Sequence, residues 1–145
     1  MRRILFITAT RIGDAVLFSG PLDHLARTYP DAEITVACGP LAAPLFRAAP
    51  GVAEVIVMAK RSGGGHWIDL WRRTAGRRWD LVVDMRGSLT SWFLRAGRRR
   101  VNRRAPGHVH RHRVIEAAAV LGMDPAPAPR LWLDDAARRR AEAVL

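Results

Sequence analysis

The stretch Arg3-Ile-Leu-Phe-Ile-Thr-Ala-Thr10, followed by Arg-Ile-Gly-Asp14, decides the fold. Residues 3–9 form an almost continuous apolar run, which is typical of a strand buried on both faces of a parallel sheet. An apolar pattern from Asp14 to about Thr28 then predicts a helix, disturbed near Gly20-Pro21. A buried strand followed by a helix is the opening of a β–α–β unit, and a parallel sheet needs the same alternation further along the chain.

The rest of the sequence continues this alternation. Strands are predicted at 33–38, 54–58 and 81–84, with a short fifth strand at 100–102, and helices at 42–49, 67–75, 88–96 and 113–121. The predicted fold class is therefore α/β, a Rossmann-like doubly wound parallel sheet with right-handed crossovers. We expect this domain to cover residues 1–123. Residues 124–145 contain a Pro-rich linker and a last helix that Asp134 and Asp135 cap.

Composition narrows the class of protein. The chain has 145 residues, enough for one domain with a sizeable core. Its single cysteine, Cys38, excludes an internal disulfide and is most simply a small buried apolar residue. The apolar stretch near the amino terminus is far shorter than the roughly 20 residues of a membrane span. These features fit a cytoplasmic protein.

The formal net charge is +11, and it is unevenly placed. All cations but Lys60 are arginines, and no carboxylate lies between Asp84 and Glu116. Such a field attracts nucleic acid, anionic lipid headgroups, or a phosphorylated or carboxylated small substrate. The same residues also fit an ordinary solvated surface. The run 98–104 is the candidate for headgroup contact, and Trp92-Phe93 is a candidate membrane-facing patch.

The first strand-to-helix turn holds one carboxylate. Only Gly13 is present there, so the turn lacks the three glycines of a dinucleotide fingerprint, and it has no Walker loop. Asp14 has two interpretations. It fits a helix cap that interacts with free N–H groups. It also fits a general base that accepts a proton from an attacking alcohol.

Several segments together resemble a known family. Arg3-Ile-Leu-Phe-Ile-Thr-Ala-Thr-Arg-Ile-Gly-Asp14 is similar to the first strand, loop and helix of bacterial ADP-heptose:lipopolysaccharide heptosyltransferases, which form glycosyltransferase family 9. Segments 32–39, 50–56, 79–88 and 112–122 resemble the same family in the same order. Arg11 and Ile12 depart from the small or thioether residues expected before Gly13.

The resemblance implies the amino-terminal, acceptor-binding half of a two-domain GT-B glycosyltransferase. The donor-binding half, which takes an ADP-heptose-like nucleotide sugar, would lie outside this chain. Asp14 matches the family's catalytic base for inverting transfer to a lipopolysaccharide core acceptor. We therefore expect the isolated chain to be inactive or nearly so, because the transition state needs both halves. The enzyme would be cytoplasmic, peripheral at the inner membrane, and would need neither a cofactor nor a metal.

The acceptor in this family is a lipid-linked acidic sugar, and arginine forks bind carboxylates and phosphates bidentately. Loops after strands supply the acceptor-binding candidates: Thr10, Arg11, Gly13, Lys60, Arg61, Arg86, Ser88 and His110. Ser88 fits equally well as the N-cap of the helix predicted after it. A metal cluster of His108, His110 and His112 is disfavoured, because Pro106-Gly107 indicates a loop there.

Two rival functions stay open at this stage. The first is a basic nucleic-acid-binding module, although the sequence has no RRM, KH or zinc-finger pattern. The second is a non-catalytic scaffold domain. Tight, salt-steep binding to RNA or DNA would favour the first rival.

Overall fold

The computed structural model describes residues 2–8, 11–59, 62–102, 113–123 and 127–144. Its elements follow the chain in this order: β1 (Arg3–Ile7), α1 (Ile12–Thr28), β2 (Glu33–Cys38), α2 (Ala43–Arg47), β3 (Val52–Val57), the 3-10 helix η1 (Ser62–Gly64), α3 (Gly65–Thr74), β4 (Arg78–Asp84), the 3-10 helix η2 (Leu89–Phe93), β5 (Arg95–Val101), α4 (Arg113–Val120) and α5 (Asp135–Val144).

The strands form one parallel sheet in the order β3-β2-β1-β4-β5. The chain therefore builds outward from β1 on one side, through β2 and β3, and then returns to place β4 on the other side of β1. This arrangement confirms the predicted α/β, Rossmann-like class. It also puts a topological switch point between β1 and β4, where doubly wound folds open a crevice beyond the carboxyl ends of the strands.

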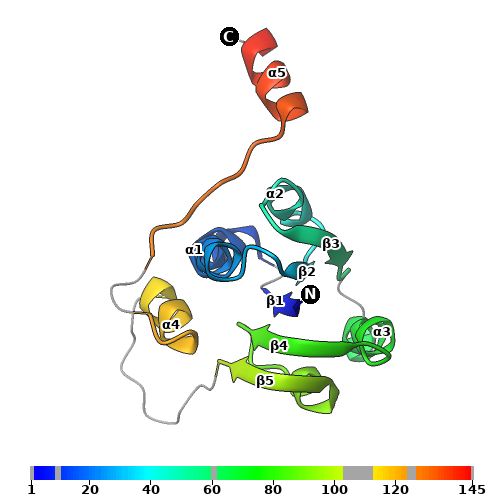
Figure 1. Cartoon of the computed structure of the whole chain (residues 1–145). Helices are drawn as coiled ribbons and strands as arrows, with labels where there is room; N and C mark the ends of the chain where they lie inside the picture. Colours follow the sequence, from blue (N-terminus) through cyan, green and yellow to red (C-terminus); the bar gives the residue numbers. More distant parts are fainter. Residues whose placement is uncertain (1, 9–10, 60–61, 103–112, 124–126, 145) are drawn as a thin grey trace.

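Helices cover both faces of the sheet (Figure 1). One core lies under α1, α2 and α4 and contains Phe6, Phe46 and Ala117. The other lies under α3 and contains Leu70 and Trp79. Because both faces are covered, β1 and β2 are buried along nearly their whole length, which explains their continuous apolar sequences.

The segment predicted as a helix at 88–96 is not one. The structure has the short helix η2 there, and β5 begins at Arg95, five residues before the predicted fifth strand. The backbone groups of β5 are satisfied by pairing with β4, and most of its side chains are at least partly exposed at the sheet edge. An arginine-rich edge strand shows no apolar alternation, so its sequence pattern does not predict a strand.

Arg99 differs from its neighbours in the basic run. Its guanidinium donates to the carbonyl oxygen of Ser91 at 3.0 Å and also to that of Leu94. Arg99 therefore holds η2 against β5. Arg98 and Arg100 are exposed, and the expectation that this run contacts lipid headgroups stays a prediction.

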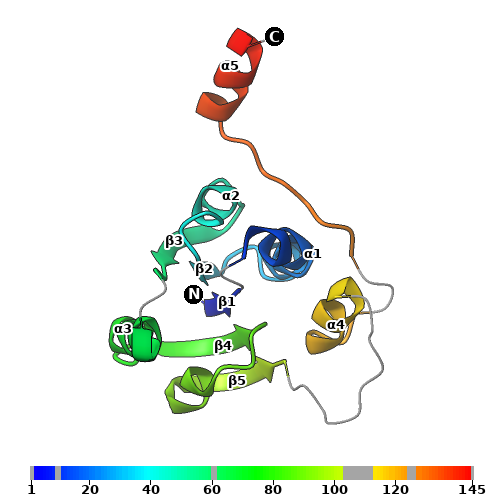
Figure 2. The same ribbon diagram turned by 180° about the vertical axis from the view of Figure 1, so that it is seen from behind.

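The chain after the Pro-rich segment returns across α1 before it leaves the domain. Gly20 of α1 lies against the carbonyl oxygens of Pro127 and Ala128, so a Cβ there would approach them to 3.0 and 2.8 Å. The amide of Arg130 donates to Ser19 Oγ at 2.8 Å. Trp132 packs at the margin of the first core. Beyond it α5 stands away from the sheet and its helices in both views (Figures 1 and 2).

Asp134 begins α5 as predicted, because its Oδ1 accepts the amide of Ala137 at 2.6 Å.

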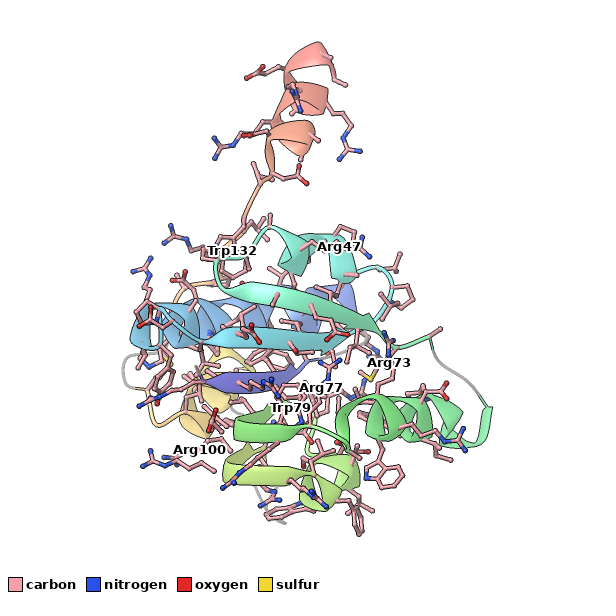
Figure 3. All side chains as sticks on the ribbon, turned by 45° about the vertical axis from the view of Figure 1, so that its right-hand side comes forward. Arg47, Arg73, Arg77, Trp79, Arg100 and Trp132 are labelled. Carbon is pink, nitrogen blue, oxygen red and sulfur yellow. The ribbon has the colours of Figure 1, made fainter. Side chains whose placement is uncertain are left out.

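Ion pairs join the elements at the amino end of the sheet, where the carboxylate of Glu54 lies 2.6 Å from the guanidinium of Arg77 and 4.0 Å from that of Arg73. Figure 3 labels Arg73, Arg77 and Trp79 together in this region. These contacts tie α3 and β4 to β3 and leave the carboxyl end of the sheet free to carry a site.

Candidate functional site at the carboxyl end of β1 and β4

The predicted site residues that the structure describes gather at the switch point. Ile7 of β1 is in register with Asp84 of β4, and the amide of Met85 donates to the carbonyl of Ile7 at 2.9 Å. The carboxyl ends of β1 and β4 are therefore neighbours. Asp14 lies on α1, the helix that follows β1, and Arg86 lies two residues after the end of β4.

Asp14 lies in the first turn of α1 and is half-buried. It is not the N-cap, because that position belongs to Arg11, whose side chain makes no capping hydrogen bond. An acidic residue in a first turn interacts favourably with the positive end of the helix dipole. Asp14 is neither walled in nor fully exposed, which suits a carboxylate at the margin of a crevice.

Gly13 has space beside it. A Cβ built on Gly13 meets no atom within 4 Å, and the backbone of this residue is not in the left-handed region. Neither local packing nor backbone conformation requires glycine at this position. The absence of a side chain does, however, keep the surface next to Asp14 open to an approaching molecule.

The loop after β4 is organised by Asp84, which the sequence analysis did not single out. This carboxylate is fully buried. Its Oδ1 accepts the amides of Arg86 at 2.9 Å and Gly87 at 3.1 Å, and its Oδ2 accepts the amide and the hydroxyl of Ser88 at 2.8 and 2.6 Å. A single side chain thus fixes the backbone of residues 86–88.

Ser88 occupies the N-cap position of η2, but it makes no side-chain capping bond there. Its hydroxyl donates to Asp84 instead. Ser88 is therefore the N-cap residue by position, as predicted, but it does not cap through its side chain, and a direct contact between this hydroxyl and a sugar acceptor would have to compete with Asp84.

Two further contacts hold the same loop. Asn102, just after β5, donates through Nδ2 to the carbonyl of Met85 at 3.1 Å. Gly87 has a φ of +67°, and a Cβ on it would collide with the carbonyl oxygen of Asn102. Glycine is required here for both reasons. The loop is consequently fixed by its neighbours before any ligand arrives.

Arg86 is the cation that this loop presents. Its guanidinium carbon lies 5.4 Å from the centre of the Trp67 ring at the start of α3, a cation–π contact. The side chain of Arg86 is exposed at the carboxyl end of the sheet. A guanidinium held over an aromatic ring has a restricted set of positions, so less entropy is lost when it binds a carboxylate or phosphate.

The structure therefore brings Arg11, Gly13, Asp14, Arg86 and Ser88 to one end of the sheet. Thr10, Lys60, Arg61 and His110 lie outside the described residues. Asp84 and Asn102 were missed. A signal for Asp84 was present, since a carboxylate at the end of a buried strand needs nearby donors, and Gly87-Ser88 three residues later can supply them.

Cys38, at the end of β2, is buried as predicted. Burial raises the pKa of its thiol from 9.0 to about 11, and the nearby Arg47 lowers it only in part. Among the described residues no group of three or more His, Cys, Asp or Glu side chains could hold a metal ion. Within the same ranges, no helix is long and apolar enough to cross a membrane.

Comparisons with known proteins support the fold. No family model matches the chain, and no curated protein sequence matches it either. Among solved structures, the chain is similar to a glycosyl transferase of family 9 from Veillonella parvula, with a TM-score of 0.72 and 18% identity over 97% of this chain and 47% of that one.

It is also similar to the E. coli heptosyltransferase WaaC. The complex with ADP gives a TM-score of 0.61 at 15% identity, over 89% of this chain and 50% of that one. The complex with ADP-2-deoxy-2-fluoro heptose gives 0.61 at 13%, over 95% and 53%. The chain thus has the fold of about half of a family 9 glycosyltransferase and spans about half the length of these structures.

Proposed function

We propose that this chain is the acceptor-binding half of an inverting glycosyltransferase. Asp14 and the Arg86 loop flank the switch point between β1 and β4, and this placement is the observation that carries the proposal. The likeness to family 9 glycosyltransferases, including a heptosyltransferase, supports it at the level of the fold.

In this proposal Asp14 acts as the general base. Its carboxylate takes the proton from an acceptor hydroxyl as that oxygen attacks the anomeric carbon of the donor sugar. The new C–O bond forms on one face while the bond to the nucleoside diphosphate breaks on the other, so the configuration inverts. The diphosphate leaves with its negative charge, and cations or helix N-termini of a donor-binding half would stabilise it.

The acceptor would be an acidic, lipid-linked sugar. Arg86 is pre-positioned by Trp67 and by the hydrogen bonds that Asp84 accepts from residues 86–88, and Arg11 is exposed just before α1. Guanidinium groups bind carboxylates and phosphates in a bidentate manner. Thr10, Gly13, Lys60, Arg61, Ser88 and His110 complete the proposed acceptor site. A lipopolysaccharide core acceptor and an ADP-heptose-like donor are the finer assignments, with the enzyme at the cytoplasmic face of the inner membrane.

The first test is acceptor binding by the chain itself. A delipidated inner-core oligosaccharide of lipopolysaccharide is titrated into the chain and into its Arg86→Ala and Arg138→Ala variants, with calorimetry as the readout. We expect Arg86→Ala to weaken binding about 10-fold or more, since a charge-assisted pair contributes roughly 1.5–3 kcal/mol. Arg138, an exposed arginine of α5, is the matched control. Equal affinities in all three proteins would refute the acceptor site.

The second test is transfer. The chain alone should give no sugar transfer from ADP-heptose, and activity should appear when a donor-binding half is supplied. Asp14→Asn should then lower kcat by at least about 100-fold while leaving acceptor affinity nearly unchanged, because the amide keeps the shape but cannot take the proton. Robust turnover by the isolated chain, or normal turnover by Asp14→Asn, would contradict the mechanism.

A further inference from the structure

One surface beside the candidate site is apolar. Of the twelve exposed large hydrophobic side chains in the described residues, five belong to the adjoining elements α3 and η2. We call this surface the apolar patch; it consists of Ile68, Trp71, Leu89, Trp92 and Phe93. Leu89 and Phe93 are 77% and 72% exposed. Clustered apolar exposure of this kind usually marks an interaction surface.

Hydrogen bonds hold the backbone that carries the patch. The indole N–H of Trp71 donates to the carbonyl of Phe93 at 3.4 Å, which joins α3 to η2. Arg99 donates from beneath to Ser91 and Leu94 and so holds the backbone of η2. The side chains of the patch therefore stand on a fixed support.

Its composition points to one kind of partner. Every exposed Trp or Phe side chain in the described residues belongs to the patch. Tryptophan and phenylalanine favour the boundary between lipid headgroups and acyl chains, where an aromatic body meets an apolar layer and a polar edge meets water.

The rim of the patch is cationic. Arg72 follows Trp71 on α3 and lies four residues after Ile68, hence on the same side of the helix. Arg95 begins β5 two residues after Phe93, and it is exposed. Its Cα is in register with that of Arg78 on β4, which is also exposed, so this edge of the sheet carries two arginines at neighbouring backbone positions. No carboxylate occurs between residues 85 and 115, so η2 and β5 carry none, and Asp69 is the one carboxylate of α3.

We infer that the apolar patch docks the protein on an anionic lipid bilayer, with Leu89 and Phe93 inserted below the headgroups and the arginine rim against their phosphates. Leu89 directly follows the loop that presents Arg86, and α3 carries both Trp67 and the patch. Docking would place the candidate acceptor site at the membrane surface. In Figures 1 and 2, α3 lies at the opposite end of the molecule from α5, so docking leaves α5 unobstructed. This inference rests on the proposed function only in the lipid-linked nature of the acceptor.

The test is vesicle sedimentation with the purified chain. Vesicles of phosphatidylcholine are compared with vesicles that also contain phosphatidylglycerol, and neither carries a sugar acceptor. We expect binding to the anionic vesicles, with tryptophan fluorescence quenched when the acyl chains are brominated. The double variant Leu89→Ser/Phe93→Ser should bind about 100-fold more weakly, since each large side chain withdrawn from the lipid costs roughly a factor of ten.

The matched control is Leu41→Ser, because Leu41 is 72% exposed but lies outside the patch, before α2. It should bind like the unmodified chain. Arg72→Gln/Arg95→Gln should bind anionic vesicles roughly 25-fold more weakly, since each cation near the surface adds roughly a factor of five. Equal binding of both vesicle types by every variant would overturn the inference. So would a chain that binds no vesicles and instead forms a dimer that the double variant loses, because the patch would then be an interface between two copies of the chain. Failure here leaves the oligosaccharide titration untouched, so the two proposals fail separately.

Discussion

Substitution of Asp84 tests the central structural claim, that one buried carboxylate fixes the loop of the candidate site. In Asp84→Asn the side chain keeps its shape but replaces one acceptor oxygen with an NH2 group. If the NH2 group takes the place of Oδ1, it faces the amides of Arg86 and Gly87; if it takes the place of Oδ2, it faces the amide of Ser88. In either orientation, the new NH2 group faces at least one backbone N–H that it cannot hydrogen-bond.

The second orientation is better, because the Ser88 hydroxyl can rotate and accept from the new NH2 group. One opposed backbone donor then remains, which costs about 2 kcal/mol. For a chain of this size that corresponds to a fall in Tm of roughly 6 °C. Asp84→Ala removes all four hydrogen bonds and should cost about 3–5 kcal/mol. Ser88→Ala removes only the hydroxyl and should cost about 1.5 kcal/mol.

Scanning calorimetry and urea unfolding measure this series, with Asp31→Asn as the control because Asp31 is exposed in the turn between α1 and β2. The expected order of destabilisation is Asp84→Ala, then Asp84→Asn, then Ser88→Ala, with the control within about 0.5 kcal/mol of the unmodified chain. If Asp84→Asn has the same Tm as the control, or if Ser88→Ala lowers the Tm most, the Asp84 carboxylate does not fix the loop of residues 86–88.

Three further outcomes follow from other positions. Gly13→Ala should leave Tm unchanged or slightly raised, since its Cβ has open space, yet weaken oligosaccharide binding several-fold if acceptor approaches there; unchanged affinity in calorimetry would count against that approach. Gly20→Ala should gain about 1 kcal/mol of helix propensity, but its Cβ should displace residues 127–132 from α1. The hydrogen-exchange rate of the Arg130 amide should therefore rise; an unchanged rate would show that residues 127–132 adjust to the Cβ and stay in contact with α1. The raised pKa of Cys38 means that, between pH 9 and 11, the folded chain keeps a thiol proton that the unfolded chain releases. The free energy of unfolding should therefore fall by roughly 2 kcal/mol as the pH rises from below 9 to 11. Urea titrations of Cys38→Ala should lack this fall.

The strands of the first core were predictable because their burial leaves a direct mark on composition. β2 occupies the predicted residues 33–38, and β1 ends two residues before the apolar run does. A strand covered on both faces must be apolar throughout, so its sequence reports its environment. The same reasoning places Asp14 and Arg86, which follow two such strands, at one end of a parallel sheet.

The edge of the sheet was not predictable in this way. The residues of β5 read Arg-Ala-Gly-Arg-Arg-Arg-Val, and only pairing with β4 makes them a strand. Their conformation is set by hydrogen bonds to a neighbour more than a dozen residues earlier, and no local pattern encodes such a bond. For the same reason the segment before β5 was expected to be a helix and forms only the short turn η2.

The sequence by itself determined the α/β class, the order of most elements and the identity of the carboxylate at the first turn, because apolar periodicity and strand-end placement are properties of the chain. Tertiary structure alone decided that Asp84 gathers four donors, that Arg99 supports η2 and that Trp71 of α3 hydrogen-bonds to Phe93 of η2. Each of these depends on atoms brought together from separate segments, and a linear pattern carries the identity of such atoms without their distances.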